Sequence, residues 1–347
     1  NRCGKIHHPG LTFIMPAYNA AATIDETIRS LKEQDLDNWY LIVVDDGSSD
    51  NTKDIIEDIA KRDTRIKLIT QTNQGPAVAR ANAIAIAETE YIAILDADDL
   101  LSKNYVRLLV DRAKDTKADI IMPNVKCIDK EGVIEENSHF GRQKLTAKMI
   151  INNSLEAFDM SVSWKLHGWM IIKTNLAKTY YTFDNVCYSK FNSDEYISRY
   201  LYLKSKTVAL TTAIYFYRYV ATSITHHFSV RHFDRILTLN HLANLCIDED
   251  VPIETTHKVY SMYRSCIIQS FLLYELHSNE IDDGGKTFSM IMDTYKAYKK
   301  NFPSKLFQHV GLKEKIKYTI SLSGENVIKL IVYMKSLLST KKRTVKN

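Results

Sequence analysis

Apolar and polar positions follow two different rhythms along the first third of the chain. Short runs of apolar, often β-branched residues are typical of strands buried on both faces, and they lie at 11–15, 40–44, 66–70, 91–95 and 120–122. Between these runs, apolar residues recur at helical spacing and predict helices within 16–34, 52–61, 75–88 and 105–113. Strands that alternate with helices of about 10–15 residues predict an α/β fold with a parallel sheet and right-handed crossovers.

The apolar run Tyr91–Leu95 is followed by three carboxylates, Asp96, Asp98 and Asp99. If the run is a strand, these side chains lie at its carboxyl end, where ligands bind in open α/β sheets. Clustered carboxylates repel one another, and their oxygen atoms suit a hard divalent cation such as Mg²⁺ or Mn²⁺. A solvated acidic loop before the next helix explains the same spacing, so both interpretations stay open at this point.

The pattern is less regular from residue 124 to 228. We expect a hairpin over 125–136 with a turn at 130–132, an acceptor-side loop without regular structure over 137–163, and a strand at 170–172. The segment Phe191–Leu203 has helical spacing, with Asn192 or Ser193 suited to the N-cap position. The alternating pattern therefore ends before residue 230.

From Val230 onward only helical spacing occurs, which predicts an all-helical C-terminal region. The last predicted helix, Glu325–Ser339, precedes a basic tail, and its apolar face consists of Val327, Ile331, Met334 and Leu338. Two interpretations stay open: this helix packs on the core, perhaps across a homo-oligomer interface, or it is a basic helix lying on an anionic membrane. The predicted organisation is a catalytic domain at 1–228, divided into halves at 11–125 and 126–228, followed by a helical region at 229–347.

Composition restricts the class of protein. Of the 347 residues, 45% are apolar and 25% are charged, which is typical of a folded globular protein. The net charge of +5 is small for this length and does not indicate a nucleic-acid partner. The five cysteines are scattered and form no C-x-x-C pair, which indicates a reducing, cytoplasmic setting. No apolar run approaches the roughly 20 residues that span a bilayer, and there is no signal-peptide pattern.

The turns after the first two predicted strands argue against a dinucleotide-binding domain. No G-x-G-x-x-G follows the first strand, where the sequence is Pro16-Ala17-Tyr18-Asn19. The turn after the second strand is acidic, which suits a nucleobase N–H and a ribose hydroxyl. With a bound metal, the same surroundings suit a diphosphate.

Four motifs carry a resemblance to a known family: PAYN at 16–19, VVDDGSSDNT at 43–52, NQGPAVAR at 73–80 and ILDADD at 94–99. In order and spacing they resemble glycosyltransferase family 2, whose members are inverting enzymes with the GT-A fold, a Rossmann-like and mostly parallel sheet flanked by helices. The resemblance covers residues 11 to about 125 strongly and extends weakly to about 228. It implies a nucleotide-sugar donor, with UDP-sugars favoured, and a divalent metal, Mn²⁺ or Mg²⁺.

The resemblance further implies transfer of a sugar to an acceptor hydroxyl in the synthesis of cell-surface polysaccharide, teichoic acid or lipid-linked glycan. The acceptor is then a glycan, a polyol phosphate or a lipid-linked sugar, and the enzyme is cytoplasmic or peripheral at the inner face of the plasma membrane. The alternative is a nucleotide-binding module or a nucleotidyltransferase. A nucleotidyltransferase is expected to have a phosphate loop rich in Gly and Arg or Lys after the first strand, and the PAYN turn is not one.

Site residues follow from the resemblance position by position. The donor-binding residues that it implies are Pro16, Tyr18, Asp46, Arg80, Asp96, Arg218 and His226. Tyr18 stacks on the base, Asp46 accepts the N3–H of uracil, and Arg80 faces the diphosphate. Asp96 contacts the ribose or the metal, while Asp98 is the principal metal ligand and Asp99 a further carboxylate. The segment around Arg218 and His226 closes over the diphosphate, where Arg218 holds phosphate or braces the fold.

The general base implied by the resemblance is Asp194, in the first turn of the helix predicted at 191–203. The family has an acidic pair at such a helix start, and Ser193 replaces its first member, which leaves Glu195 as the alternative. A carboxylate at a helix N-terminus stays ionised at neutral pH and can accept a proton from an acceptor hydroxyl. Trp164 and Trp169 suit either stacking on an acceptor sugar ring or packing in the core.

Overall fold

The computed structural model describes residues 8–129, 131–134, 146–218, 228–330 and 332. The chain divides into two compact units, residues 1–227 and 228–347, and each is described by itself. His226 and most of the predicted helix 325–339 lie outside the described residues.

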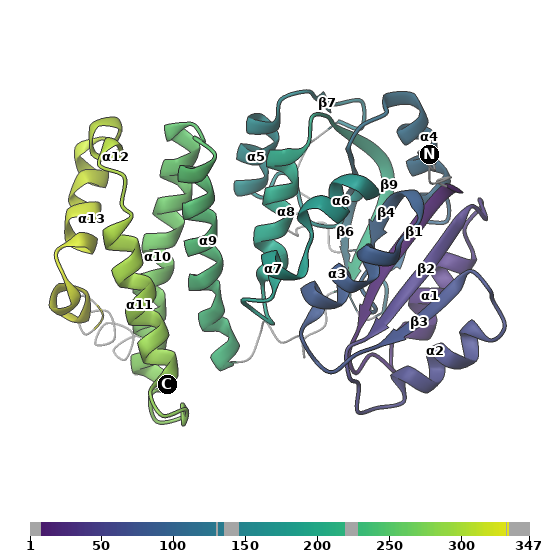
Figure 1. The fold of residues 1–347 in the computed structure, drawn as a ribbon, viewed down its shortest axis with the longest axis horizontal. Coiled ribbons are helices and arrows are strands. Elements are labelled where there is room, and N and C mark those ends of the chain that lie inside the picture. The colour runs from purple at the N-terminus through teal and green to yellow at the C-terminus, as the bar shows by residue number, and fades with distance from the viewer. Residues whose placement is uncertain (1–7, 130, 135–145, 219–227, 331, 333–347) are drawn as a thin grey trace, which may run out of the picture. The chain divides into compact units, whose positions relative to one another are not determined.

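The first unit is built on a nine-stranded mixed sheet with the order β3-β2-β1-β4-β8-β6-β9-β5, where β7 also pairs with β9 (Figure 1). Its parallel half consists of β1 (His8–Ala17), β2 (Trp39–Asp45), β3 (Ile66–Thr70) and β4 (Thr89–Ile94). Next to β4, β8 (Ile171–Lys173) runs antiparallel between β4 and β6 (Ile120–Ile128), and β9 (Val208–Arg218) runs parallel to β6. The short strands β5 (Leu100–Leu101) and β7 (Ile150–Ile151) are antiparallel to β9. The predicted α/β class, with a mostly parallel sheet, is confirmed.

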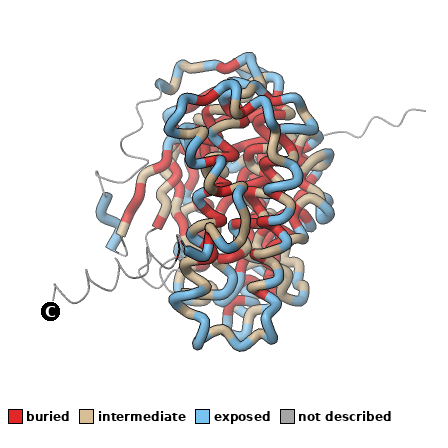
Figure 2. The backbone as a smooth tube through the Cα atoms, turned by 90° about the vertical axis from the view of Figure 1, so that its left-hand side faces the viewer, coloured by how far each residue is buried: buried red, intermediate tan, exposed pale blue. Residues whose placement is uncertain are grey.

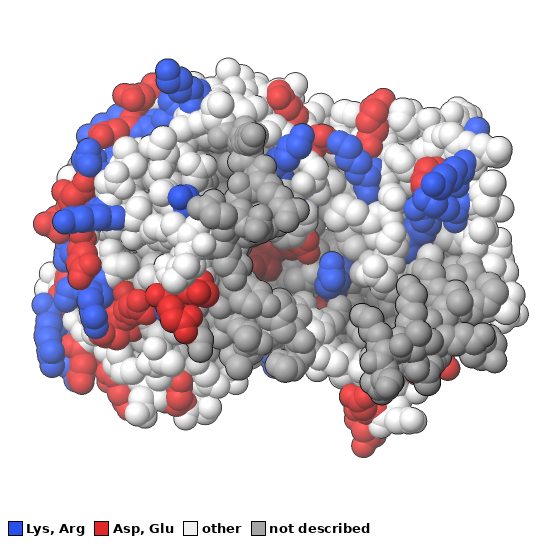
Figure 3. Space-filling model, turned by 180° about the vertical axis from the view of Figure 1, so that it is seen from behind, with Lys and Arg blue, Asp and Glu red and all other residues white. Residues whose placement is uncertain are grey.

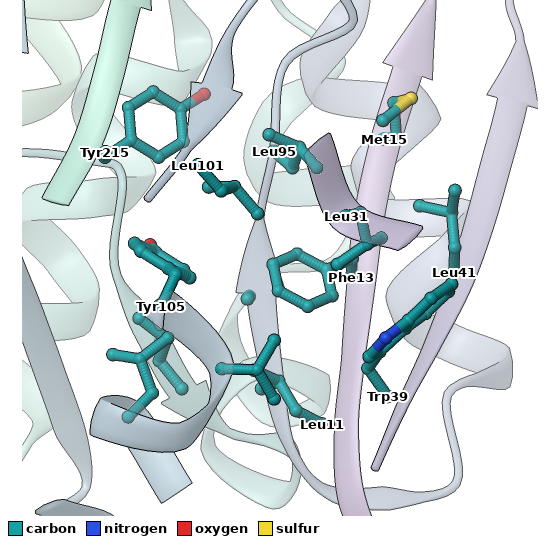
Figure 4. Close-up of a cluster of buried hydrophobic side chains, with 14 of the residues drawn as sticks. Leu11, Phe13, Met15, Leu31, Trp39, Leu41, Leu95, Leu101, Tyr105 and Tyr215 are labelled. Carbon is teal, nitrogen blue, oxygen red and sulfur yellow. The ribbon is translucent and has the colours of Figure 1, made fainter. Parts of the chain in front are cut away.

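Helices cover both faces of this sheet because its central strands are apolar on both sides. On one face, α1 (Ile24–Lys32), α2 (Thr52–Ala60) and α4 (Tyr105–Thr116) pack against alternate residues of β1 and β2. Figure 4 shows this core, in which Phe13, Trp39 and Tyr105 are among the largest buried side chains. On the other face lie α3 (Pro76–Ile86) and α6 (Thr174–Tyr180). Both layers leave the carboxyl ends of the parallel strands at one edge of the sheet.

Two expectations for residues 125–163 are corrected. Residues 154–162 form the helix α5 (Ser154–Val162) instead of an irregular loop, because Asn153 caps the N–H groups of Leu155 and Glu156 and the helix buries Phe158. Within the same predicted loop, residues 150–151 form β7, and residues 137–145 lie outside the described residues. The hairpin at 125–136 is reduced, in the described part, to one bridge between Ile128 and Ile134, because Val125–Ile128 continue β6 alongside β9.

The remaining helices of the first unit are α7 (Phe183–Val186) and α8 (Ser193–Lys204). The predicted helix at 191–203 is confirmed as α8, and its N-cap position is Asn192. Its first turn carries Asp194 and Glu195.

The second unit, where it is described, contains helices and no strand. They are η1 (Val230–Phe233), α9 (Asp234–Asp248), α10 (Ile253–His277), α11 (Lys286–Lys300), α12 (Lys305–His309) and α13 (Leu312–Leu322). Tyrosines are among the largest buried side chains of this unit, and Figure 2 shows exposed and buried residues alternating along its helices. Residues 325–330 are helical, with Ile328 buried and Val327 half-buried. Across the described residues, no helix combines the length and the apolar character that crossing a bilayer requires.

Candidate active site at the carboxyl ends of the strands

Arg80 on α3 joins two carboxylates that are far apart in the sequence. Its Nη2 donates to Asp96 Oδ1 at 2.5 Å, and its Nη1 lies 3.4 Å from Asp194 Oδ2. The side chain of Arg80 is buried, and its Nε finds no acceptor among the described residues. Burial alone would lower the pKa of Arg80, but Asp96 and then other neighbours hold that pKa well above its usual range. The structure therefore brings three of the predicted site residues together, with the carboxylates of Asp96 and Asp194 on either side of the Arg80 guanidinium.

Asp96 is further held by aromatic side chains. Its Oδ2 accepts a hydrogen bond from Trp169 Nε1 at 3.0 Å, and its backbone N–H donates to the Tyr215 hydroxyl at 3.0 Å. The Trp169 ring stacks on Tyr215 with centroids 5.5 Å apart, and Tyr217 lies 5.0 Å away. Trp169 is thus part of the site, whereas the exposed Trp164 covers the guanidinium of Arg199 at 4.9 Å.

Asp99 differs from its neighbours because its carboxylate is fully buried and each of its two oxygens accepts a hydrogen bond. Its Oδ2 accepts from the Tyr215 hydroxyl at 2.6 Å, and its Oδ1 accepts from the backbone N–H of Arg218 at 2.8 Å. Burial, followed by Asp96 and Asp98, raises the pKa of Asp99 well above the ordinary value. Asp99 therefore fastens the loop after β4 to the end of β9, and it has no surface from which to bind a ligand.

Asp98 is the carboxylate of this loop that, within the described part of the chain, is hydrogen-bonded only to its own backbone N–H. No other described residue donates a hydrogen bond or forms an ion pair with its side chain. Burial and then the charge of Asp96 raise the pKa of Asp98 to about 6, although Arg218 and Arg80 oppose the shift. A cation beside Asp98 would relieve this repulsion, so the donor set fits a divalent metal.

Within the described residues, no three His, Cys, Asp or Glu side chains are grouped so that they could hold a metal alone. Mg²⁺ and similar ions are commonly bound by one or two carboxylates together with substrate phosphates. Asp98, with Asp96 beside it, can supply the protein's share of such a site.

Arg218 braces the same loop from β9. Its Nε donates to the Asp98 carbonyl oxygen at 2.9 Å, and its Nη2 pairs with Glu26 Oε2 on α1 at 2.7 Å. Of the two roles expected for Arg218, the described contacts are those of a brace. His226 lies outside the described residues.

The base-binding side is formed by the turns after β1, β2 and β3. Tyr18 is exposed, whereas Pro16 is buried within β1. Asp46 is buried, and its two oxygens accept three hydrogen bonds of 2.8 Å, from Gln71 Nε2 and from the backbone N–H groups of Gln74 and Gly75. A carboxylate offers about four acceptor sites, so one remains for a ligand. Asp46 thus also fixes the loop that leads into α3.

Gly75 allows this loop to contact the segment before α8. Its φ of +92° is unfavourable for other residues, and a Cβ there would lie 2.8 Å from the Cα and carbonyl oxygen of Lys190. Lys190 Nζ in turn donates to the Asn73 carbonyl at 2.8 Å. The donor-side loop and the start of α8, which carries Asp194, are therefore packed against each other.

Asp194 and Glu195 have different surroundings. Asp194 faces Arg80 and keeps 41% of its side chain exposed. The protein atoms around Asp194 raise its pKa above the ordinary value; Arg80 opposes this shift and Asp96 adds to it. Glu195 instead pairs with Arg199 at 3.2 Å and accepts from Asn192 at 3.2 Å. Of the two candidates, Asp194 is the one that lies with the acidic loop.

Sequence reasoning missed the aromatic side chains that complete the site. Tyr215 and Tyr217 share one face of β9, and the buried Tyr181 adjoins Arg80. Burial raises the pKa of Tyr181 to about 12, so its hydroxyl stays protonated at neutral pH. The period-two spacing of Tyr215 and Tyr217 in a strand was the one available signal.

Residues 12–174 match the family model Glycosyl transferase family 2. The chain is similar to the glycosyltransferase GlyG of Streptococcus pneumoniae, with 27% identity over 223 residues, 62% of this chain and 72% of GlyG. It is 33% identical over 144 residues, 41% of this chain, to UDP-Glc:alpha-D-GlcNAc-diphosphoundecaprenol beta-1,3-glucosyltransferase WfgD of Escherichia coli, and it spans 55% of that protein.

Among solved structures, the fold resembles S. aureus TarS 1-349 in complex with UDP-GlcNAc. The TM-score is 0.63 at 18% identity, and the match covers 87% of this chain and 84% of TarS 1-349. At this identity the similarity concerns the fold alone. The predicted GT-A fold with a helical C-terminal region is confirmed.

Proposed function

We propose that the protein transfers a sugar from a UDP-sugar to an acceptor hydroxyl with inversion at the anomeric carbon. The match of residues 12–174 to the family model Glycosyl transferase family 2 supports this proposal. The observation that carries the proposal is the group of Arg80, Asp96 and Asp194 beside the unsatisfied carboxylate of Asp98. One positive charge, a metal-binding carboxylate and a partly exposed base are what a single displacement at a sugar diphosphate requires.

On the donor side, Tyr18 stacks on the uracil and the remaining acceptor site of Asp46 takes its N3–H. Arg80 faces the diphosphate and orients it. A divalent metal, Mn²⁺ or Mg²⁺, held by Asp98 with Asp96, would stabilise negative charge on the leaving diphosphate. Arg218 keeps the Asp98 loop in place through its contact with the Asp98 carbonyl oxygen.

On the acceptor side, Asp194 accepts the proton of the attacking hydroxyl. Burial raises the pKa of Asp194, and its contact with Arg80 opposes that shift by favouring the ionised form, which can accept a proton. The exposed ring of Trp164 is suited to stack on an acceptor sugar, and Trp169 positions Asp96. Attack then proceeds from the face opposite the leaving diphosphate.

For the acceptor we propose a lipid-linked or polymeric glycan or a polyol phosphate of the cell surface. The name of WfgD, which describes transfer to a sugar on diphosphoundecaprenol, supports the lipid-linked case. Figure 3 shows Lys and Arg interspersed with Asp and Glu on the face in view. A cytoplasmic site of action is part of the proposal and rests on the scattered cysteines, of which the four in the described residues form no disulfide.

The test is release of nucleoside diphosphate from a panel of nucleotide sugars, measured with Mn²⁺, with Mg²⁺ and with EDTA. We expect release from at least one UDP-sugar, dependent on metal and stimulated by an acceptor glycan. Asp194→Asn should remove the stimulated release, and Asp111→Asn, an equal charge change at an exposed position on α4, should not. Equal rates with metal and with EDTA would contradict the role of Asp98.

A further inference from the structure

The helix α13 in the second unit has an apolar outer face. Leu312 and Ile316, one helical turn apart, are 74% and 50% exposed. The buried side of the same helix consists of Tyr318 and Ser321. A surface helix usually directs its apolar stripe toward the core and its polar residues outward. In α13 two of the largest apolar side chains point away from the core instead.

Lysines border this apolar face. Lys313 and Lys317 are exposed, and Lys315 is half-buried. Glu314, the one acidic residue of α13, pairs with the buried Arg264 at 3.1 Å and also with Lys317. Glu314 therefore partly neutralises Lys317, whereas Lys313 and Lys315 form no ion pair with another described residue. We call Leu312, Ile316 and these three lysines the α13 face.

The α13 face belongs to a basic segment of the chain. Between Lys286 and Val332 the sequence has nine lysines, no arginine and three acidic residues, although the whole chain has a net charge of only +5. The lysines are Lys286, Lys296, Lys299, Lys300, Lys305, Lys313, Lys315, Lys317 and Lys329. Positive charge is therefore concentrated in the part of the sequence that contains α13.

We propose that the α13 face binds the surface of an anionic lipid bilayer. Leu312 and Ile316 would enter the boundary between head groups and acyl chains, while the lysines extend toward the anionic head groups. Clustered lysines near an anionic leaflet add attraction that falls off within a Debye length. This proposal does not depend on the sugar-transfer activity, because no residue of the α13 face belongs to the candidate active site.

A bilayer fits the α13 face better than a second copy of the chain. A symmetric contact between two α13 faces would bring like-charged lysines together, which disfavours it. A stable protein interface also buries about 1,200–2,000 Å² in total, far more than two apolar side chains supply. Shallow insertion into a charged surface requires no such area.

The experiment is flotation of the full-length protein with phosphatidylcholine vesicles, with and without phosphatidylglycerol. We expect binding to the anionic vesicles only, with loss of binding at high salt. The double variant Leu312→Ser/Ile316→Ser and the triple variant Lys313→Gln/Lys315→Gln/Lys317→Gln should each weaken the apparent affinity at least about tenfold. Their thermal unfolding should match the parent, because the changed side chains are largely exposed.

Matched controls lie in the first unit. Val133→Ser removes another exposed apolar side chain, and Lys53→Gln/Lys61→Gln/Lys67→Gln removes three exposed lysines. Neither should change vesicle binding.

The proposal is overturned if neutral vesicles bind equally well, if no vesicles bind, or if the α13 variants bind like the parent. It is also overturned if the double variant converts a dimer to a monomer in light scattering. Nucleoside diphosphate release with a water-soluble acceptor is measured separately, so failure of the proposed function would leave the vesicle result intact.

Discussion

Charged side chains inside the helical unit are paired with opposite charges, whereas the acidic loop after β4 contains a carboxylate without such a partner among the described residues. In the helical unit, the buried Arg264 pairs with Glu314 and its guanidinium lies 4.7 Å from the centre of the Tyr318 ring. In the loop after β4, Asp98 has no pairing partner among the described residues, and it shares its surroundings with two other carboxylates. The helical unit is arranged for stability, whereas the loop retains repulsion that a ligand can relieve. Removing charge should therefore have opposite consequences in the two places.

The largest effect is expected from Asp194→Asn. Asparagine preserves size and most hydrogen bonding but cannot accept a proton, so the transfer rate should fall about 10²–10⁴-fold, the usual contribution of a general base. Binding of UDP with Mn²⁺, measured by calorimetry, should be retained. Glu195→Gln is the control, since Glu195 is paired with Arg199. If the control is inactive and Asp194→Asn is active, the base is Glu195.

Asp98→Asn should lower activity and raise stability together. Because burial and Asp96 raise the pKa of Asp98 from 3.8 to about 6, its ionised form destabilises the metal-free fold at neutral pH. A shift of about two units corresponds to about 2–3 kcal/mol, so the variant should unfold at higher denaturant concentration in EDTA. UDP binding should no longer be strengthened by Mn²⁺. A less stable variant would contradict this prediction, because it would show that the ionised Asp98 carboxylate stabilises the metal-free fold.

Arg264→Met should have the opposite pattern in the helical unit. It leaves Glu314 without its buried partner and removes the contact with Tyr318, and we expect a loss of about 2–3 kcal/mol in unfolding free energy. Turnover with a water-soluble acceptor, measured well below the melting temperature, should stay close to that of the parent. Arg235→Met, at an exposed position on α9, is the control and should be nearly neutral.

Local patterns in the sequence were sufficient to predict the strands and helices of the parallel half of the fold. The strand runs and the helical stripes are short-range signals, and the acidic turn after the fourth strand followed directly from them. The environment of that turn could not be predicted, because it depends on side chains that are distant in the sequence. Tyr215 bonds Asp99 across 116 residues, and Trp169 reaches Asp96 across 73. Spacing does not reveal which of three neighbouring carboxylates turns inward.

Metal affinity should depend on pH through Asp98. A proton and a metal compete for the same oxygens, so with a pKa of about 6 the affinity for Mn²⁺ should be nearly constant above pH 7. Below pH 6 it should fall by about tenfold per unit. The stability of the metal-free protein should move the other way, since a raised folded-state pKa means that Asp98 stops destabilising the fold as pH falls from about 6 toward 3.8. Calorimetric titration at several pH values tests the first statement, and Asp98→Asn should abolish the dependence.

The smallest effect is expected where the acidic loop meets α1, at the pair between Glu26 and Arg218. The side chain of Glu26 is 51% exposed, so solvent screens the pair, and Glu26→Gln should change the unfolding free energy by less than about 1 kcal/mol. Arg218→Lys keeps the charge but loses the Nε–H that donates to the Asp98 carbonyl oxygen. We therefore expect weaker Mn²⁺ binding in Arg218→Lys and unchanged binding in Glu26→Gln. If both variants weaken metal binding equally, the ion pair between Glu26 and Arg218 holds the Asp98 loop in place. A half-exposed ion pair would then stabilise the loop more than solvent screening predicts.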